Sequence, residues 1–215
     1  MKLIITILLS SVLLSCSATT IQSKIEKDTI QKEQLGIEQK AEQLKIIYQK
    51  LTSPYGEVYE QEYFNAFPDS FGLLNGLFGY TDKKPMGRDF NPRPLYNDAY
   101  LYIEKFFKLN EIEKEKYNKK IIDISINGIW YADGVANFQH GLQSKVKNNL
   151  GTFCELLSNR KDKEIKSFWY FYFDGPCPEK KIPEELQKVK QINEKIYLLM
   201  QEALKDVQEE WKGLH

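Results

Sequence analysis

The sequence predicts an all-α protein, an irregular multi-helix bundle of about seven helices that ends in a long C-terminal helix. Apolar residues recur at three- and four-residue intervals along most of the chain, and no segment alternates cleanly as a half-buried strand would. With 215 residues, 42% of them hydrophobic, the chain is long enough to bury a sizeable core. Its formal net charge is zero and it has only three arginines, so a nucleic-acid partner is not expected.

The first 15 residues are predicted to be a signal peptide. Lys2 precedes a mainly apolar run from Leu3 to Leu14. As a helix this run would span roughly 18 Å, well short of the ~30 Å hydrocarbon core of a membrane. It therefore has the length of a signal-peptide core and not of a membrane-spanning helix.

The sequence Leu13-Leu14-Ser15-Cys16 resembles the lipobox of bacterial lipoproteins. The resemblance implies cleavage before Cys16 and attachment of fatty acyl chains such as palmitate to that residue, with residues 16–22 as a tether. Two or more acyl chains give stable membrane attachment, where one gives only marginal binding. The alternative is an ordinary secreted protein with an accidental Cys16.

The same resemblance implies a location in the cell envelope. The protein would be lipid-anchored and would face the periplasm. By similarity to enterobacterial sorting, Ser17 favours the outer membrane over the inner one.

In an oxidising compartment Cys154 and Cys177 form an even pair, which favours a disulfide between them. The alternative is two buried free thiols, because small apolar thiols pack well in cores. Neither cysteine has a Cys-x-x-Cys partner, and His140 and His215 are the only histidines. We therefore expect no metal and no cofactor.

Residues 23–215 are expected to form a single helical domain, in which residues 23–52 are an N-terminal helical arm. Ile30, Ile37, Leu44 and Leu51 are spaced seven residues apart, which predicts a narrow helical stripe. The arm is either a stalk that binds a partner or an amphipathic helix that packs on its own domain, and the second interpretation is favoured.

The next segment, residues 57–80, is rich in aromatic residues and predicts two helices separated by Pro68, the second capped by Asp69 or Ser70. Residues 82–94 then hold three prolines together with Arg88 and Arg93, which predicts a loop. Ordered loops of this length are often functional, so Arg88 and Arg93 are candidate binding residues.

From Leu95 onward the helical spacing returns. One face is predicted to carry Tyr96, Tyr100, Ile103, Phe106 and Phe107, and a helix through Ile122 is closed by Asn127-Gly128. The run Ser167–Phe173, with no strand to pair with, predicts a buried helix end. The last 30 residues or so, from Pro183 to Trp211, predict one continuous helix.

The segment Trp130–His140 is the best candidate for chemistry. Asp133, Asn137 and His140 lie at i, i+4 and i+7, so one helix face would present all three beside Trp130. An Asp–His pair suits general base catalysis, but a polar seam between packed helices is the favoured interpretation. No catalytic residue is assigned, because the chain lacks the nucleophile-elbow, phosphate-loop and zinc-protease motifs.

Four segments resemble a family of uncharacterised all-helical bacterial lipoproteins: residues 67–80, 94–96, 125–143 and 167–178. The resemblance implies fold and location, and no activity. We therefore expect a lipid-anchored, non-catalytic protein-binding module. By analogy with small periplasmic lipoproteins, it would be immunity-like. The alternatives are an envelope hydrolase that uses Asp133 and His140, and a purely structural lipoprotein.

Overall fold

The computed structural model describes residues 35–81 and 91–212. The chain divides into two compact units, residues 1–39 and 40–215. The described residues confirm the all-α class: residues 35–51 are helical, and nine further α-helices follow, with two short 3-10 helices and one pair of two-residue strands. The elements are η1 (Gly56–Tyr59), α2 (Glu60–Ala66), α3 (Phe71–Phe78), β1 (Tyr80–Thr81), β2 (Asn91–Pro92), α4 (Ala99–Phe107), α5 (Lys114–Ser125), α6 (Gly134–Asn148), α7 (Leu150–Ser158), α8 (Asp162–Phe173), η2 (Glu184–Leu186), α9 (Val189–Ile192) and α10 (Glu194–Trp211).

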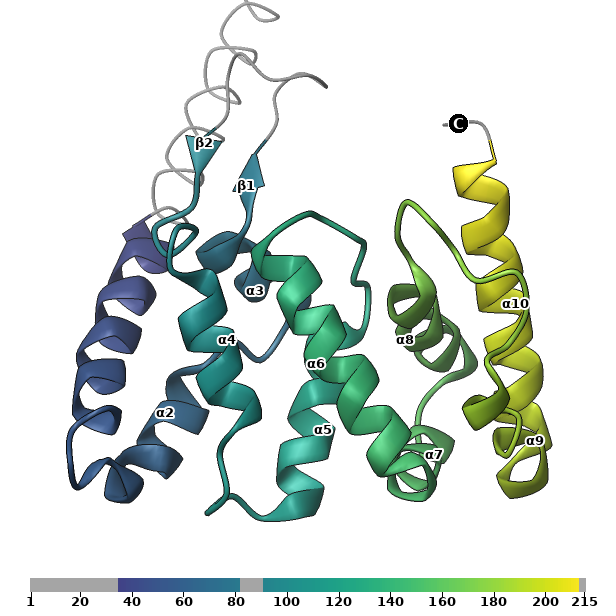
Figure 1. Ribbon diagram of the computed structural model, residues 1–215, viewed down its shortest axis with the longest axis horizontal. Coiled ribbons are helices and arrows are strands. Elements are labelled where there is room, and N and C mark those ends of the chain that lie inside the picture. Colours follow the sequence, from purple (N-terminus) through teal and green to yellow (C-terminus); the bar gives the residue numbers. More distant parts are fainter. Residues whose placement is uncertain (1–34, 82–90, 213–215) are drawn as a thin grey trace, which may run out of the picture. The chain divides into compact units, whose positions relative to one another are not determined.

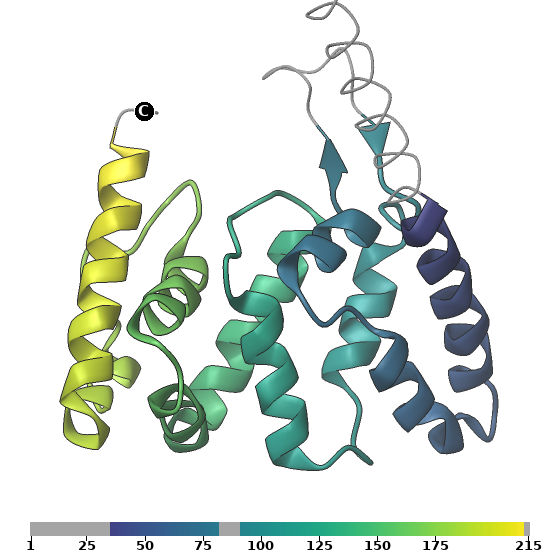
Figure 2. The ribbon, with the colours of Figure 1, turned by 180° about the vertical axis from the view of Figure 1, so that it is seen from behind.

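The helices of the second unit follow one another in roughly chain order from one side to the other (Figure 1). Among the described elements α8 and α10 pack most extensively against each other, and α6 packs against α3, α4, α7 and α8. Seen from either side, the β1–β2 pair, the loop before α6 and the loop after α8 lie at one end of the helices (Figures 1 and 2). Of the residues that the sequence nominates for function, Trp130, Asp133 and Cys177 lie in these loops, and Arg93 directly follows β2.

The helical stripe predicted for the N-terminal arm is confirmed where it is described. Residues 35–51 are helical, and Ile37, Ala41, Leu44 and Leu51 are buried. The signal peptide, the tether, Cys16 and Ile30 lie outside the described residues, as does Arg88. Within the described ranges, no helix is long and apolar enough to cross a membrane.

The two helices predicted around Pro68 are α2 and α3, and Ser70 is the residue that precedes α3. Their aromatic residues join a core cluster, in which the rings of Phe67 and Phe106 stack with centroids 4.0 Å apart. In α4 the buried face differs from the prediction: Tyr102 is buried, while Tyr100 is 55% exposed.

The apolar run predicted as a buried helix end is the second half of α8. Trp169 and Phe171 are fully buried there. Lys166 of α8 forms an ion pair with Asp206 of α10 at 2.8 Å, and Tyr170 donates a hydrogen bond to Glu210. The contact between these two helices therefore combines a buried apolar face with a polar rim.

The predicted long C-terminal helix is confirmed as α10, but the prediction that it runs without a break from Pro183 is wrong. The segment is divided into η2, α9 and α10, and the break falls at Asn193, whose backbone is extended. The Asn193 side chain accepts a hydrogen bond from the Ile196 amide at 3.1 Å and so caps the start of α10. Asparagine favours such caps over a helix interior, which explains the break.

The disulfide predicted between Cys154 and Cys177 is not formed, because both cysteines are free. Cys154 is buried in α7, where burial raises the pKa of its thiol to about 11. Cys177 is exposed in the loop after α8. A disulfide needs both sulfurs at one place, whereas here one lies in the core and the other at the surface.

Candidate binding site

The loop between α5 and α6, residues 126–133, carries the residues that the sequence singles out for chemistry. Two of its residues, Asn127 and Asp133, have positive φ angles of 60° and 61°. Such angles cost free energy in residues with a side chain, so the surrounding contacts must hold the loop in place. The Asn127 amide donates to the Ser167 hydroxyl at 2.7 Å, and this bond fixes the start of the loop to α8.

The end of the loop is fixed through Asp133, the residue that precedes α6. Its carboxylate accepts a hydrogen bond from the hydroxyl of Tyr96. This hydrogen bond, with smaller contributions from burial and from nearby charge, raises the pKa of Tyr96 to about 12. Asp133 therefore acts as an acceptor that holds a tyrosine in position.

Two further tyrosines complete this surface. The ring of Tyr80 meets the ring of Tyr96 edge-on at 5.9 Å, and it meets that of Tyr131 edge-on at 6.0 Å. Edge-to-face pairs of this kind are favourable aromatic geometries. All three tyrosines are partly exposed and Asp133 is exposed. We call the set Tyr80, Tyr96, Tyr131 and Asp133 the tyrosine patch.

Arg93, one of the two arginines predicted to contact a partner, lies beside the tyrosine patch. It follows β2, and its amide donates to the Gly79 carbonyl at 3.0 Å. Its own carbonyl accepts a hydrogen bond from the Tyr96 amide at 3.0 Å. The structure thus brings Arg93, Asp133 and three tyrosines together, although they lie up to 53 residues apart in the chain.

Asn137 and His140 lie on α6, and both are exposed, so they do not form the polar seam between packed helices that the sequence interpretation favoured. Within the part of the chain that the structure describes, no hydrogen bond or ion pair joins His140 to Asp133. His140 instead lines a separate polar cavity of about 240 Å³ together with Trp130. The residues of the predicted constellation are therefore divided between two places.

This second place, which we call the α6–α8 cavity, is formed around Asp174. The Asp174 side chain is 7% exposed and accepts hydrogen bonds from the Trp130 amide at 2.6 Å and from the Trp211 indole at 2.8 Å. Its carbonyl accepts another from the Gln139 amide group at 2.7 Å. Asp174 thereby links the loop before α6, α6 itself and the end of α10.

Gly175 allows the chain to turn away from Asp174. Its φ is +155°, and an added Cβ atom would meet the Trp130 ring at 3.6 Å. The turn carries the exposed Cys177 into the wall of the same cavity. Sequence reasoning linked neither Asp174 nor Cys177 to His140, because they come together only through the packing of α8 on α6.

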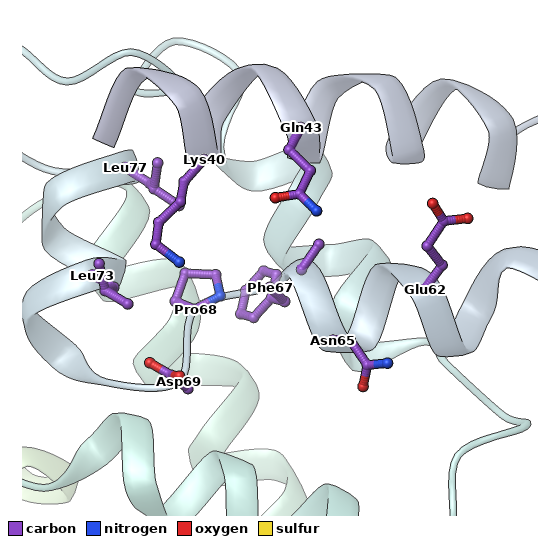
Figure 3. Close-up of a pocket in the computed structure, with 10 residues that line it drawn as sticks. Lys40, Gln43, Glu62, Asn65, Phe67, Pro68, Asp69, Leu73 and Leu77 are labelled. Carbon is purple, nitrogen blue, oxygen red and sulfur yellow. The ribbon is translucent and has the colours of Figure 1, made fainter. Parts of the chain in front are cut away.

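A third hollow lies between residues 40–51, α2 and α3, and has a volume of about 200 Å³ (Figure 3). Lys40 and Gln43 reach into it from one side, and Phe67 and Pro68 form part of its floor (Figure 3). No sequence motif indicated this hollow. Its polar and apolar groups come from three separate segments.

A half-buried lysine lies close to this region. Lys120 of α5 donates a hydrogen bond to the Phe64 carbonyl at 2.6 Å, and its ammonium group lies 4.7 Å from the centroid of the Phe64 ring. Burial lowers the pKa of Lys120 to about 8. Among the residues that the structure describes, no group of three or more His, Cys, Asp or Glu side chains is placed to hold a metal ion.

Comparison with known protein families, with curated proteins and with solved structures finds no match for this chain.

Proposed function

We propose that the protein is a lipid-anchored, non-catalytic binding protein of the bacterial cell envelope, which holds a protein partner at the tyrosine patch. The observation that carries this proposal is the hydrogen bond from Tyr96 to Asp133 within a group of three edge-packed tyrosines. Tyrosine and arginine are enriched among the residues that contribute most to protein interfaces. Arg93 beside the patch adds the second of these residue types.

The patch is suited to binding because its side chains are already held in place. A tyrosine has only two side-chain torsions, and the hydrogen bond to Asp133 removes part of the remaining freedom of Tyr96. A surface that is ordered before it binds loses less conformational entropy on association. The hydrolase alternative gains no support, since the Asp133 carboxylate is engaged by Tyr96 and His140 lines a different cavity.

The binding proposal is tested by capture from envelope extracts with three forms of the protein. Wild type and Tyr55→Ala are expected to capture the same partner, because Tyr55 is 84% exposed and lies outside the patch. Tyr131→Ala is expected to lose that partner while it keeps the helical content of wild type. If all three forms capture the same proteins in equal amounts, the patch is not the binding surface.

The anchoring part of the proposal rests on Leu13-Leu14-Ser15-Cys16 and is tested separately. Intact-mass spectrometry of the protein from its native host is expected to find the leader removed and Cys16 carrying acyl chains. Cys16→Ser is expected to leave the protein unlipidated and to release it from the membrane fraction. An unmodified Cys16 in the mature wild-type protein would contradict the anchor and would leave the binding proposal standing.

A further inference from the structure

The α6–α8 cavity is a second site, distinct from the tyrosine patch. Of the residues that the sequence nominated, it takes Trp130 and His140, and the patch takes Asp133. Its volume of about 240 Å³ lies just below the 300–1,000 Å³ range typical of ligand pockets. The cavity is therefore sized for one small molecule.

The charges around the cavity disfavour an anion. Lys147 is paired with Glu185 at 2.8 Å, so its positive charge is largely neutralised. Glu179 and Asp174 also line the cavity and add two negative charges. An anionic ligand would therefore meet a wall with a net negative charge, which would repel it.

The same groups give no specific place for a cation. Asp174 is only 7% exposed, and its carboxylate oxygens accept hydrogen bonds from the Trp130 amide and the Trp211 indole, so little of this carboxylate can reach a ligand. Glu179 is exposed to solvent, where an ion pair with a ligand would be weak. What remains is a neutral, polar ligand.

The remaining polar groups of the wall both donate and accept hydrogen bonds. The imidazole of His140 does so when neutral. The amide of Gln143 donates to the Tyr172 carbonyl at 2.9 Å and keeps its oxygen as an acceptor. Tyr172 belongs to the wall as well: the residue is 3% exposed, and its hydroxyl group has no hydrogen-bond partner among the residues that the structure describes.

The hydroxyl groups of a ligand match this wall, because each one also donates and accepts. The indole of Trp130 adds an aromatic surface for the C–H face of a ring. We propose that the α6–α8 cavity binds a neutral sugar ring through His140, Gln143 and Trp130. This site goes beyond the proposed protein partner, and its test does not involve the tyrosine patch.

Cys177 provides a direct measure of occupancy, because its exposed thiol lines the cavity. Alkylation of the full chain by iodoacetamide is followed by mass mapping of each cysteine peptide. Buried Cys154 serves as the unreactive internal reference. The probes are glucose, galactose, mannose and N-acetylglucosamine, with glucuronate as the anionic counterpart of glucose.

At least one neutral sugar is expected to slow the alkylation of Cys177, with a half-maximal effect in the millimolar range. Where glucose protects, glucuronate is expected to need at least about tenfold more, because its carboxylate meets the negative wall. No protection by any neutral sugar at about 50 mM, well above millimolar affinity, would overturn the proposal.

Matched variants on α6 separate binding from general effects on the fold. His140→Ala is expected to weaken protection about fivefold, the value of one ordinary hydrogen bond. Asn137→Ala, an exposed change on the same helix away from the cavity, is expected to leave protection unchanged. If His140→Ala does not fold, Gln143→Ala takes its place in the comparison, because Gln143 is a second proposed contact of the sugar. Equal protection in the cavity variant and in Asn137→Ala would overturn the proposal.

Discussion

Three of the buried tyrosines in the described part of the chain, Tyr63, Tyr117 and Tyr172, predict opposite effects of the same substitution. The Tyr63 hydroxyl donates to the Tyr102 carbonyl at 2.7 Å, and the Tyr117 hydroxyl donates to the Phe106 carbonyl at 2.8 Å. The Tyr172 hydroxyl is also buried, and within the described ranges it has no hydrogen-bond partner. Tyr-to-Phe removes only the oxygen atom, so the hydrogen bond is the main difference between the sites.

Tyr63→Phe and Tyr117→Phe are each expected to lower the free energy of unfolding by about 1 kcal/mol, the net value of a buried hydrogen bond. Tyr172→Phe is expected to raise it by about 1 kcal/mol, because burying an unpaired hydroxyl costs roughly 1–3 kcal/mol by mutational measures. For a chain of this length each change corresponds to roughly 2–4 °C in Tm.

The measurement is urea unfolding at pH 7, followed by circular dichroism, with wild type and the three variants side by side. The slope of the free energy of unfolding against urea concentration should be the same in all four proteins, so that a shifted midpoint reports a change in stability alone. If Tyr172→Phe is destabilised as much as Tyr63→Phe, the Tyr172 hydroxyl is hydrogen-bonded. The wall of the α6–α8 cavity then contains no unpaired tyrosine hydroxyl.

Three further predictions concern glycine packing, a lysine and the tyrosine patch. Gly134→Ala is expected to cost roughly 1–3 kcal/mol, since its Cβ would lie 2.7 Å from a backbone carbonyl oxygen. Gly151→Ala, with no atom within 4 Å of its Cβ, should gain up to about 1 kcal/mol in the same unfolding assay. The pKa of Lys120 is lowered to about 8 from its ordinary 10.5, so the unfolded chain binds more protons between these values and the lysine's contribution to stability rises with pH there. The stability of wild type relative to Lys120→Met should therefore rise from pH 8 to pH 10, and a constant difference would contradict the lowered pKa. Asp133→Asn should lower the pKa of Tyr96 from about 12 toward 10, measured by ultraviolet titration, because the acceptor loses its charge.

The helices could be predicted because the spacing of apolar residues along the chain indicates which face of each helix is buried. Val135, Phe138, Leu142 and Val146 are spaced for one face of α6, and all four are fully buried. The run from Ser167 to Phe173 was ambiguous by periodicity, and the lack of a pairing strand decided correctly for a helix. Local pattern was sufficient in these cases because burial follows the helical repeat.

The break at Asn193 could not be obtained from the apolar pattern, because the stripe continues across it. Val189 and Ile196 are both buried, so the spacing on either side remains compatible with one helix. The signal lay in the polar residues instead. Asn193 followed by Glu194 is a typical start of a helix, and its side chain does cap the Ile196 amide.

The two candidate sites depend on contacts that no short segment contains. Tyr96 and Asp133 are 37 residues apart, and Trp130 and Asp174 are 44 residues apart. Each contact depends on how two helices pack, and helical spacing does not fix the pairing of helices. The sequence therefore nominated individual residues, while their division into a patch and a cavity required the fold.

The loop of residues 126–133 explains why that division occurs. Trp130 and Tyr131 are adjacent residues of this loop, yet Trp130 lines the α6–α8 cavity and Tyr131 belongs to the tyrosine patch. The loop holds this arrangement against the cost of positive φ angles at Asn127 and Asp133, of order 1–3 kcal/mol each. Each of these residues also makes a hydrogen bond to a different helix or segment, which offsets the cost. The two strained positions are therefore the ones whose hydrogen bonds attach the loop to α8 and to Tyr96, next to the two surfaces.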